Sequence, residues 1–403
     1  MTGDQPFLPY GRHHIEDDDI ASVVAVLKGD FLTTGPATQA FEKALAERTG
    51  ASHAVVCSSG TTALHLAALA LDLGPGDGVV VPSITFLATA NAARYVGADV
   101  IFVDVDPDTG LMRPDDFLKA IKRSPSRVKA VFPVHLAGQS PDMQAIAEIA
   151  RKNDIVIVED ACHALGSTYP SASGQALVGG CEHSDIAAFS FHPVKTIAMG
   201  EGGAVTTNDE KLAKRMKRLC SHGMTRETED FINQAMAFDD QGAANPWYYE
   251  MQELGFNFRA SDIHCALGLS QLNKFERFAE RRKNLTSSYD QALKPLWPVL
   301  RPIGRMPGCD PVWHLYVVFI DFAAAGISRA DVMTLLRQKG IGSQVHYVPV
   351  HCQPYYRKLY GNVSLPGADR YYERCLSLPL FPGMKDADIQ RVVEALTLLI
   401  GSN

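Results

Sequence analysis

Two polar side chains that follow apolar segments could do chemistry together. Lys195 follows the apolar segment 185–192, and Asp160 lies near the end of segment 154–161. A lysine partly withdrawn from water has a lowered pKa and can attack a carbonyl carbon to form a Schiff base. A carboxylate ending a buried strand is costly unless it is paired, for instance with a protonated ring nitrogen. Each residue has a plainer explanation, because Lys195 could be a surface lysine, Asp160 a cap and nearby His163 a core histidine.

Small polar residues at two other places could complete such a site. Residues 58–62 (SSGTT) separate the apolar segment 53–57 from a helical pattern, so their N–H groups would begin a helix and could bind a phosphate. An ordinary helix cap is the alternative. Asn257 and Arg259 precede a helix capped by Ser261, and their spacing leaves their roles open. In combination, a phosphate-binding turn, a carboxylate and a lysine are the parts that pyridoxal phosphate requires.

Seven apolar segments rich in Val and Ile predict the strands that position these side chains. They are 53–57, 78–83, 99–106, 129–136, 154–161, 185–192 and 203–207. Continuous apolarity is what strands buried on both faces require, and helical patterns lie between these segments. Strand, helix and strand repeated in this way predict an α/β fold with a mostly parallel sheet flanked by helices. Such sheets bind their ligands at the carboxyl ends of the strands.

The rest of the chain predicts a second, smaller unit. We expect a large domain over residues 1–275, which includes an N-terminal arm, and a smaller C-terminal α/β domain over 276–403. The elements expected after residue 207 are helices over 209–220, 261–282 and 328–339, strands over 313–321 and 342–350, and a terminal helix from Asp386. The polar and aromatic segment 224–250 could be a flap over the active site or a solvated insertion.

Composition and charge exclude several classes of protein. The chain has 403 residues and a net charge of −7, without a long basic run, so we expect no nucleic acid and no anionic membrane as its main partner. No apolar stretch approaches the roughly 18 residues of a membrane helix, and the N-terminus lacks the apolar core of a signal peptide. The eight cysteines contain no C-x-x-C pair, which favours reduced thiols in a cytoplasmic protein and predicts no metal site.

The segments SSGTTAL, EDACHALG, FSFHPVK with GEGG, and LGFNFRASDIHCALGLSQL, in this order, resemble those of the DegT/DnrJ-type sugar-nucleotide aminotransferases. The resemblance implies a fold-type I transferase that depends on pyridoxal 5′-phosphate. It assigns Lys195 to the Schiff base, Asp160 to the pyridine nitrogen, and His163 and Phe86 to the two sides of the cofactor ring.

The same resemblance implies further contacts. It assigns Gly60, Thr61 and Ser190 to the cofactor phosphate, and Asn257 to a contact made from the second subunit of a homodimer with shared active sites. The residues assigned to the sugar nucleotide are Tyr10, Phe31, Leu32, Thr33, His346, Tyr347, Val348 and Pro349.

The resemblance also suggests a substrate. The segments CSHGM, PWYYEMQELGFNFR and QVHYVPVH are similar to the branch that makes UDP-4-amino-4,6-dideoxy-N-acetyl-β-L-altrosamine for pseudaminic acid. We therefore expect L-glutamate and a UDP-linked 4-keto-6-deoxy-N-acetyl-hexosamine as substrates. Alternatives are a dTDP- or GDP-linked keto sugar, a UDP-4-ketopentose, or a non-catalytic cofactor-binding regulator. Lys195 disfavours the regulator and also a related dehydratase branch, which has histidine at this position.

Overall fold

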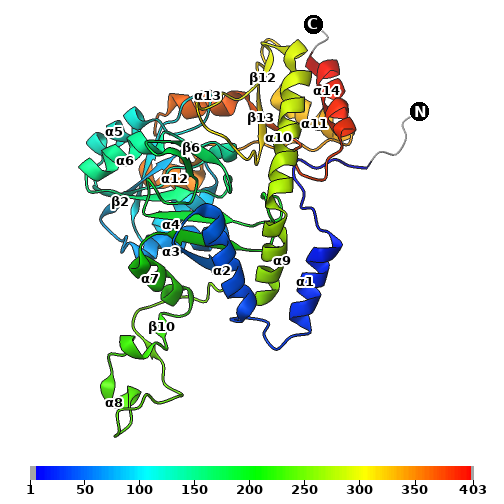
Figure 1. Cartoon of the computed structure of the whole chain (residues 1–403). Helices are drawn as coiled ribbons and strands as arrows, with labels where there is room; N and C mark the ends of the chain where they lie inside the picture. The colour runs from blue at the N-terminus through cyan, green and yellow to red at the C-terminus, as the bar shows by residue number, and fades with distance from the viewer. Residues whose placement is uncertain (1–5, 401–403) are drawn as a thin grey trace.

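A seven-stranded sheet forms the centre of the protein, whose computed structural model describes residues 6–400 (Figure 1). Its strands are β1 (His53–Cys57), β2 (Asp77–Pro82), β3 (Asp99–Val103), β4 (Arg127–Val131), β5 (Val156–Asp160), β8 (Ile186–Ser190) and β9 (Gly203–Thr207). Their order is β1-β9-β8-β5-β4-β2-β3. β9 is antiparallel to β1 and β8, whereas the other neighbouring pairs are parallel. The predicted mostly parallel α/β sheet is therefore confirmed.

Helices cover both faces of this sheet because successive strand residues point to opposite sides. Val55 and Cys57 enter one hydrophobic core, which also contains residues of α3 (Gly60–Ala70) and α4 (Leu87–Tyr95). Val56 enters the other core. The helices that contribute to this second core are α2 (Pro36–Thr49), α5 (Pro114–Arg123), α6 (Met143–Lys152) and α9 (Asp262–Asn273). Burial on both sides explains why the strands have continuous apolar sequences.

The C-terminal part of the chain contains a three-stranded antiparallel sheet flanked by helices. Its strands are β12 (Leu300–Pro302), β13 (Tyr316–Ile320) and β14 (Cys375–Leu378), with β13 in the middle. The helices of this part of the chain are α10 (Phe275–Ala292), α11 (Arg329–Gln338), α12 (Pro354–Tyr360), α13 (Pro366–Arg374) and α14 (Asp386–Ile400). Of these, α12 packs against the large sheet, where the centroid of the Tyr356 ring lies 5.1 Å from that of the Phe102 ring of β3. The predicted domain boundary at 275/276 falls at the start of α10, which rises from the large sheet toward the small one (Figure 1).

Two predicted elements are wrong. Residues 342–350 form no strand, and Gln344 makes one isolated bridge to Ser377, because β12 and β14 occupy the two edges of β13. The helix expected over 261–282 is divided at Lys274, where α9 ends and α10 begins. The helix expected over 209–220 is confirmed as α7 (Glu210–Cys220), one residue shorter. Among the elements that were not predicted are α1 (Asp17–Leu27) and the hairpin of β6 (Thr168–Ser171) and β7 (Gly174–Leu177).

The segment 224–250 projects away from the body of the protein (Figure 1). Its ends pair as β10 (Met224–Thr225) and β11 (Glu250–Met251), and α8 (Gln234–Ala237) lies near its tip. Ile232 and Trp247 are 76% and 74% exposed. None of its residues lines the cavity at the carboxyl ends of the parallel strands, so the segment is not a flap over that cavity within its own chain. Within residues 6–400, none of the helices has the length and apolarity that a membrane crossing requires.

Candidate functional site

A cavity of about 490 Å³ lies at the carboxyl ends of the parallel strands. Asp160 and Ser190 end β5 and β8, Lys195 lies on the turn after β8, and Phe86 follows β2. Because parallel strands place their carboxyl ends at one edge, these residues, which are distant in sequence, surround one space. The segment from Gln344 to Val348 closes the cavity from the side of the small sheet.

The N-terminus of α3 forms an anion-binding surface on one wall of the cavity. Ser59 Oγ accepts from the Thr62 amide at 3.2 Å, and Thr62 Oγ1 accepts from the Ser59 amide at 2.9 Å. This cap leaves the amides of Gly60 and Thr61 without an intrahelical acceptor. A Cβ atom at Gly60 would lie 2.7 Å from Ser190 Cβ, so only glycine allows the helix to begin beside β8. Free amides and the helix dipole together favour a phosphate.

Asp160 is 5% exposed and is held by two donors. Thr89 Oγ1 donates to its Oδ2 at 2.6 Å, and the Cys162 amide donates to its Oδ1 at 3.2 Å. The neighbouring Glu159 points to the other face of β5, where its Oε2 lies 2.8 Å from His135 Nε2. The strand therefore directs one of two adjacent carboxylates into the cavity and uses the other as a buried structural partner.

Lys195 presents an amine to the same cavity. Burial lowers its pKa, although the nearby thiol of Cys162 and carboxylate of Asp160 act in the opposite direction. A lowered pKa increases the fraction of neutral amine, which is the nucleophilic form. Cys162 is not a competing nucleophile, because burial raises the pKa of its thiol well above the usual range.

Neutral imidazoles and a phenol form a second wall. His163 Nδ1 accepts from the Ala137 amide at 3.3 Å, so Nε2 carries the proton and donates to Tyr347 Oη at 3.0 Å. Burial lowers the pKa of His163 and raises that of Tyr347, which keeps both groups uncharged. The His314 ring lies 4.4 Å from the His163 ring between centroids, and its pKa is also lowered by burial.

A buried arginine supports this region from behind. Arg282 is 0% exposed, and its Nη1 donates to the carbonyl oxygens of Trp313, His314 and Leu380 at 3.1–3.3 Å. Its Nη2 donates to the carbonyl oxygen of Lys195 at 3.4 Å. Burial lowers the pKa of the guanidinium to about 10. Arg282 therefore joins α10 to the lysine turn and to the segment that contains His314 and precedes β13.

The structure gathers most of the predicted site residues around the cavity. Those lining it are Tyr10, Gly60, Thr61, Phe86, Asp160, His163, Ser190, Lys195, His346, Tyr347 and Val348. Phe31, Leu32, Thr33, Asn257 and Pro349 do not line it. Phe31 and Leu32 are 56% and 49% exposed, since their loop lies on the outer surface, and Pro349 is buried beneath Val348.

Sequence reasoning missed three contributors, which are Thr89, Arg282 and His314. His314 lies at the start of a predicted strand and could have been recognised as another strand-terminal histidine. Thr89 and Arg282 lie within helices, and their sequence context contains no signal of their role.

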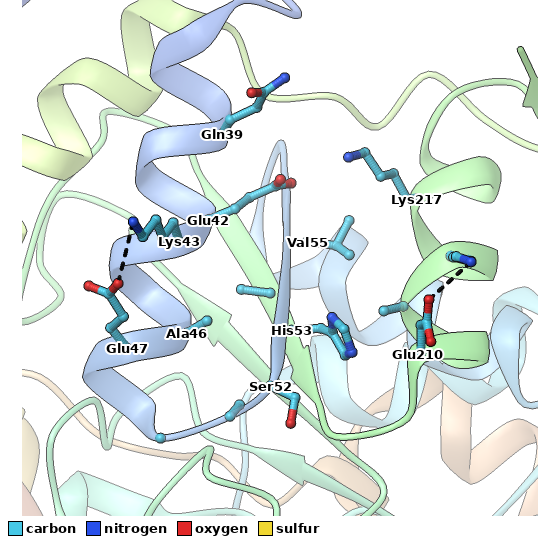
Figure 2. A pocket seen from close by; sticks show the side chains of 15 residues that line it. Gln39, Glu42, Lys43, Ala46, Glu47, Ser52, His53, Val55, Glu210 and Lys217 are labelled. Carbon is cyan, nitrogen blue, oxygen red and sulfur yellow. Dashed lines mark ion pairs between the residues drawn. The ribbon is translucent and has the colours of Figure 1, made fainter. Parts of the chain in front are cut away.

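A second cavity, of about 630 Å³, lies apart from this site between α2, β1 and α7 (Figure 2). Its charged side chains pair locally, as Lys43 with Glu47 at 3.9 Å and Lys214 with Glu210 at 3.0 Å. Glu42 Oε1 accepts from the Val56 amide at 3.0 Å at the free edge of the sheet. Of these contacts, only that of Glu42 reaches the edge strand β1, because the two ion pairs lie within α2 and α7. None of the predicted site residues lines this cavity.

The residues around the first cavity fit pyridoxal phosphate. The free amides of α3 suit its phosphate, the Asp160 carboxylate suits a protonated ring nitrogen, and the Lys195 amine suits its aldehyde. His163 and Phe86 lie on the cavity wall where a flat ring could be enclosed. The three required chemical groups therefore face one space of suitable size.

Known proteins resemble the chain over nearly its whole length. Residues 13–397 match the sequence pattern of the DegT/DnrJ/EryC1/StrS aminotransferase family. The spore coat polysaccharide biosynthesis protein SpsC of Bacillus subtilis (strain 168) is 38% identical over 393 residues, 97% of this chain and 96% of SpsC.

Two solved structures have the same architecture. Helicobacter pylori PseC, an aminotransferase involved in the biosynthesis of pseudoaminic acid, is 28% identical with a TM-score of 0.87, covering 98% of this chain and 100% of PseC. The PLP form of Spr1654 from Streptococcus pneumoniae is 28% identical with a TM-score of 0.86, covering 98% of this chain and 99% of Spr1654. This similarity agrees with the predicted fold-type I architecture.

Proposed function

Because this chain belongs to the DegT/DnrJ/EryC1/StrS aminotransferase family, we propose that it transfers an amino group from L-glutamate to C4 of a UDP-linked 4-keto-6-deoxy-N-acetyl-hexosamine. Membership of the family establishes that the protein is a nucleotide-sugar aminotransferase that uses pyridoxal 5′-phosphate. Our proposal adds the substrate, UDP-2-acetamido-2,6-dideoxy-β-L-arabino-hexos-4-ulose, and the product, UDP-4-amino-4,6-dideoxy-N-acetyl-β-L-altrosamine. The similarity to PseC over the full chain supports it.

The observation that carries the mechanism is that Lys195 and Asp160 face one cavity. The bound cofactor supplies a ring that accepts electrons from a developing carbanion. Asp160, oriented by Thr89, would hold a proton on the ring nitrogen. Lys195 would hold the cofactor through its amine, and this amine could also take up and release a proton beside it. The lowered pKa of Lys195 lets the amine take up and release this proton without a large energetic cost.

The remaining cavity residues bind and enclose the substrates in our proposal. Gly60, Thr61 and Ser190 hold the cofactor phosphate, while His163 and Phe86 enclose its ring. Tyr10, His346, Tyr347 and Val348 contact the sugar nucleotide, together with Pro349 behind them. Neutral imidazole and phenol groups can form hydrogen bonds with sugar hydroxyls. Because they carry no charge, they do not attract the anionic part of the substrate to the place of the sugar.

We assign the active form to a homodimer with shared sites. Asn257, Phe31, Leu32 and Thr33 do not line the cavity of their own chain, and we propose that they reach the cavity of the partner subunit. Exposed apolar side chains support an interface, since Phe31 and Trp247 are 56% and 74% exposed. All eight cysteines are free, in agreement with the cytoplasmic location that we propose.

The alternative is the same reaction on another nucleotide keto sugar. SpsC is more similar in sequence than PseC, at 38% against 28% identity, and its name refers to a spore coat polysaccharide. This observation supports the alternative, because the relative with the higher identity is named for a spore coat polysaccharide and not for pseudoaminic acid. A non-catalytic regulator is disfavoured, because such a protein has no need of a desolvated lysine facing the cavity.

The proposal is tested with purified enzyme, L-glutamate and a panel of UDP-, dTDP- and GDP-linked keto sugars. We expect amination at C4 of the UDP-linked 4-keto-hexosamine, identified by NMR of the product, and a visible absorption band that borohydride bleaches. Lys195→Ala should remove both the band and the turnover. Equal kcat/KM for UDP and dTDP substrates would contradict the nucleotide assignment, and wild-type turnover by the Lys195→Ala variant would contradict the mechanism.

A further inference from the structure

Three potential metal ligands meet beside the loop that closes the active-site cavity. His351, Cys352 and Asp369 place one donor atom each within 4.8 Å of one another. His351 Nε2 lies 3.4 Å from Cys352 Sγ and 3.9 Å from Asp369 Oδ1. The lack of paired cysteines predicted no zinc site, but this cluster uses one cysteine with two other ligand types. We propose that it is a binding site for a divalent transition metal ion, with Zn²⁺ as the expected occupant.

The donor chemistry favours zinc. Imidazole nitrogen, thiolate sulfur and carboxylate oxygen are the ligands that Zn²⁺ uses in proteins, at about 2.0–2.3 Å. Tetrahedral coordination at these bond lengths separates the ligand atoms by about 3.3–3.7 Å. The separation of 3.4 Å between His351 Nε2 and Cys352 Sγ lies in this range, and that of 3.9 Å to Asp369 Oδ1 is slightly longer. Mg²⁺ and Ca²⁺ prefer all-oxygen sites, so a mixed nitrogen and sulfur set disfavours them.

The histidine is oriented in the way that metal-bound histidines usually are. Its other ring nitrogen, Nδ1, lies 2.6 Å from Ser83 Oγ. With the proton on Nδ1 and donated to Ser83, the lone pair of Nε2 faces Cys352 and Asp369. His351 is 4% exposed, so the ring is held within the protein and its orientation is restricted.

The third ligand is also anchored. The amides of Gly367 and Ala368, at the start of α13, donate to the Asp104 carboxylate at 3.0 and 2.8 Å. Asp369 follows directly, and its side chain is 51% exposed. The helix therefore fixes the backbone of Asp369, while the exposed carboxylate can rotate the short distance that coordination requires. Three protein ligands leave a fourth position that water can occupy.

A metal here would connect the closing loop to α13. Val348 and Gln353 line the active-site cavity on either side of His351 and Cys352. Coordination by these two residues and by Asp369 would restrict the movement of this loop without contacting Lys195. We expect the metal to change substrate affinity more than cofactor binding. The proposal is independent of which sugar nucleotide the enzyme uses.

The test uses the holoenzyme after dialysis against a chelator, with Co²⁺ as a spectroscopic probe and Zn²⁺ for calorimetry. We expect one metal ion per chain and d–d absorption of tetrahedral Co²⁺ in the red, beyond the absorption of the cofactor. Cys352→Ser should remove this spectrum. Ser83→Ala should weaken Zn²⁺ binding by about 10–100-fold, as loss of an orienting partner does at other sites. Asp369→Asn should weaken it as well.

Cys309→Ser is the matched control, because Cys309 is also partly exposed but lies elsewhere in the chain. It should leave the Co²⁺ spectrum unchanged. Retention of the cofactor absorption band shows that each variant is folded. No stoichiometric binding, or a tetrahedral Co²⁺ spectrum that persists in Cys352→Ser, would overturn the proposal. Failure of the sugar-nucleotide assays has no effect on this outcome, so the two proposals are tested separately.

Discussion

The hydroxyl of Thr89 donates to the carboxylate of Asp160 across 2.6 Å. Thr89 lies in α4, and Asp160 ends β5, so the bond fixes the carboxylate from an element that is separate from its own strand. A second donor, the Cys162 amide, holds the other oxygen. Because Asp160 is nearly buried, its orientation depends on these few contacts rather than on water.

Replacement of Thr89 tests this relationship. Thr89→Val keeps the shape of the side chain but removes the donor, and a hydrogen bond to a buried carboxylate contributes about 1.5–3 kcal/mol. We expect kcat to fall by about 10–100-fold, because the carboxylate is then free to turn away from the cofactor ring. Thr89→Ser keeps a hydroxyl and should retain most of the activity. Steady-state kinetics with glutamate compare the variants, and equal kcat values for Val and Ser would contradict this role.

Gly60 should tolerate no larger residue. A Cβ atom there would lie 2.7 Å from Ser190 Cβ and 3.2 Å from Cys162 Sγ, so Gly60→Ala must push α3 away from β8. Overpacking of this kind costs about 1–3 kcal/mol, and we expect cofactor affinity to fall by about 5–150-fold. Gly29→Ala is the control, because its nearest neighbour would be the Val26 carbonyl oxygen at 3.4 Å. Titration with pyridoxal phosphate, followed by absorbance, measures both variants, and equal affinities would disprove the steric argument.

His346 should make the fold sensitive to acid. Burial lowers its pKa to about 3, from an ordinary value near 6.5. Between these values the unfolded chain binds a proton that the folded chain does not, so stability falls as pH decreases through this window. The expected loss is about 1.4 kcal/mol per pH unit for this imidazole. Urea unfolding at pH 6.5 and 5 should show a smaller loss for His346→Asn than for the wild type, and identical losses would contradict the assignment.

The shared active site can be tested by mixing two inactive variants. Lys195→Ala removes the amine, and Asn257→Ala removes a residue that we assign to the cavity of the partner subunit. In a hybrid dimer one cavity carries both substitutions and the other carries neither. An equal mixture that exchanges subunits should therefore recover about a quarter of wild-type activity. Absence of recovery after confirmed exchange would show that Asn257 acts within its own chain.

The large sheet could be predicted in detail because its strands share one environment, which is burial on both faces. β1, β2 and β8 are buried on both faces, which requires continuous apolar sequences that are read directly from the chain. The strands of the smaller sheet were harder to predict from the sequence than those of the large sheet. Residues 342–350 alternate like a strand, yet β14 pairs with β13 at the position they would need. Competition between segments for one partner cannot be read from the pattern of either segment alone.

The sequence by itself determined that two residues meet: Asp160 ends one buried strand and Lys195 follows another, and the order of strands and helices places both at one edge of the sheet. Tertiary structure alone decided which other side chains join them. Thr89, Arg282 and His314 reach the site through helix packing and through the approach of the small sheet, whereas Asn257 and Phe31 are directed outward. The physical reason is that backbone hydrogen bonding and burial are local to a segment, while contacts between side chains of distant segments exist only after the segments have packed.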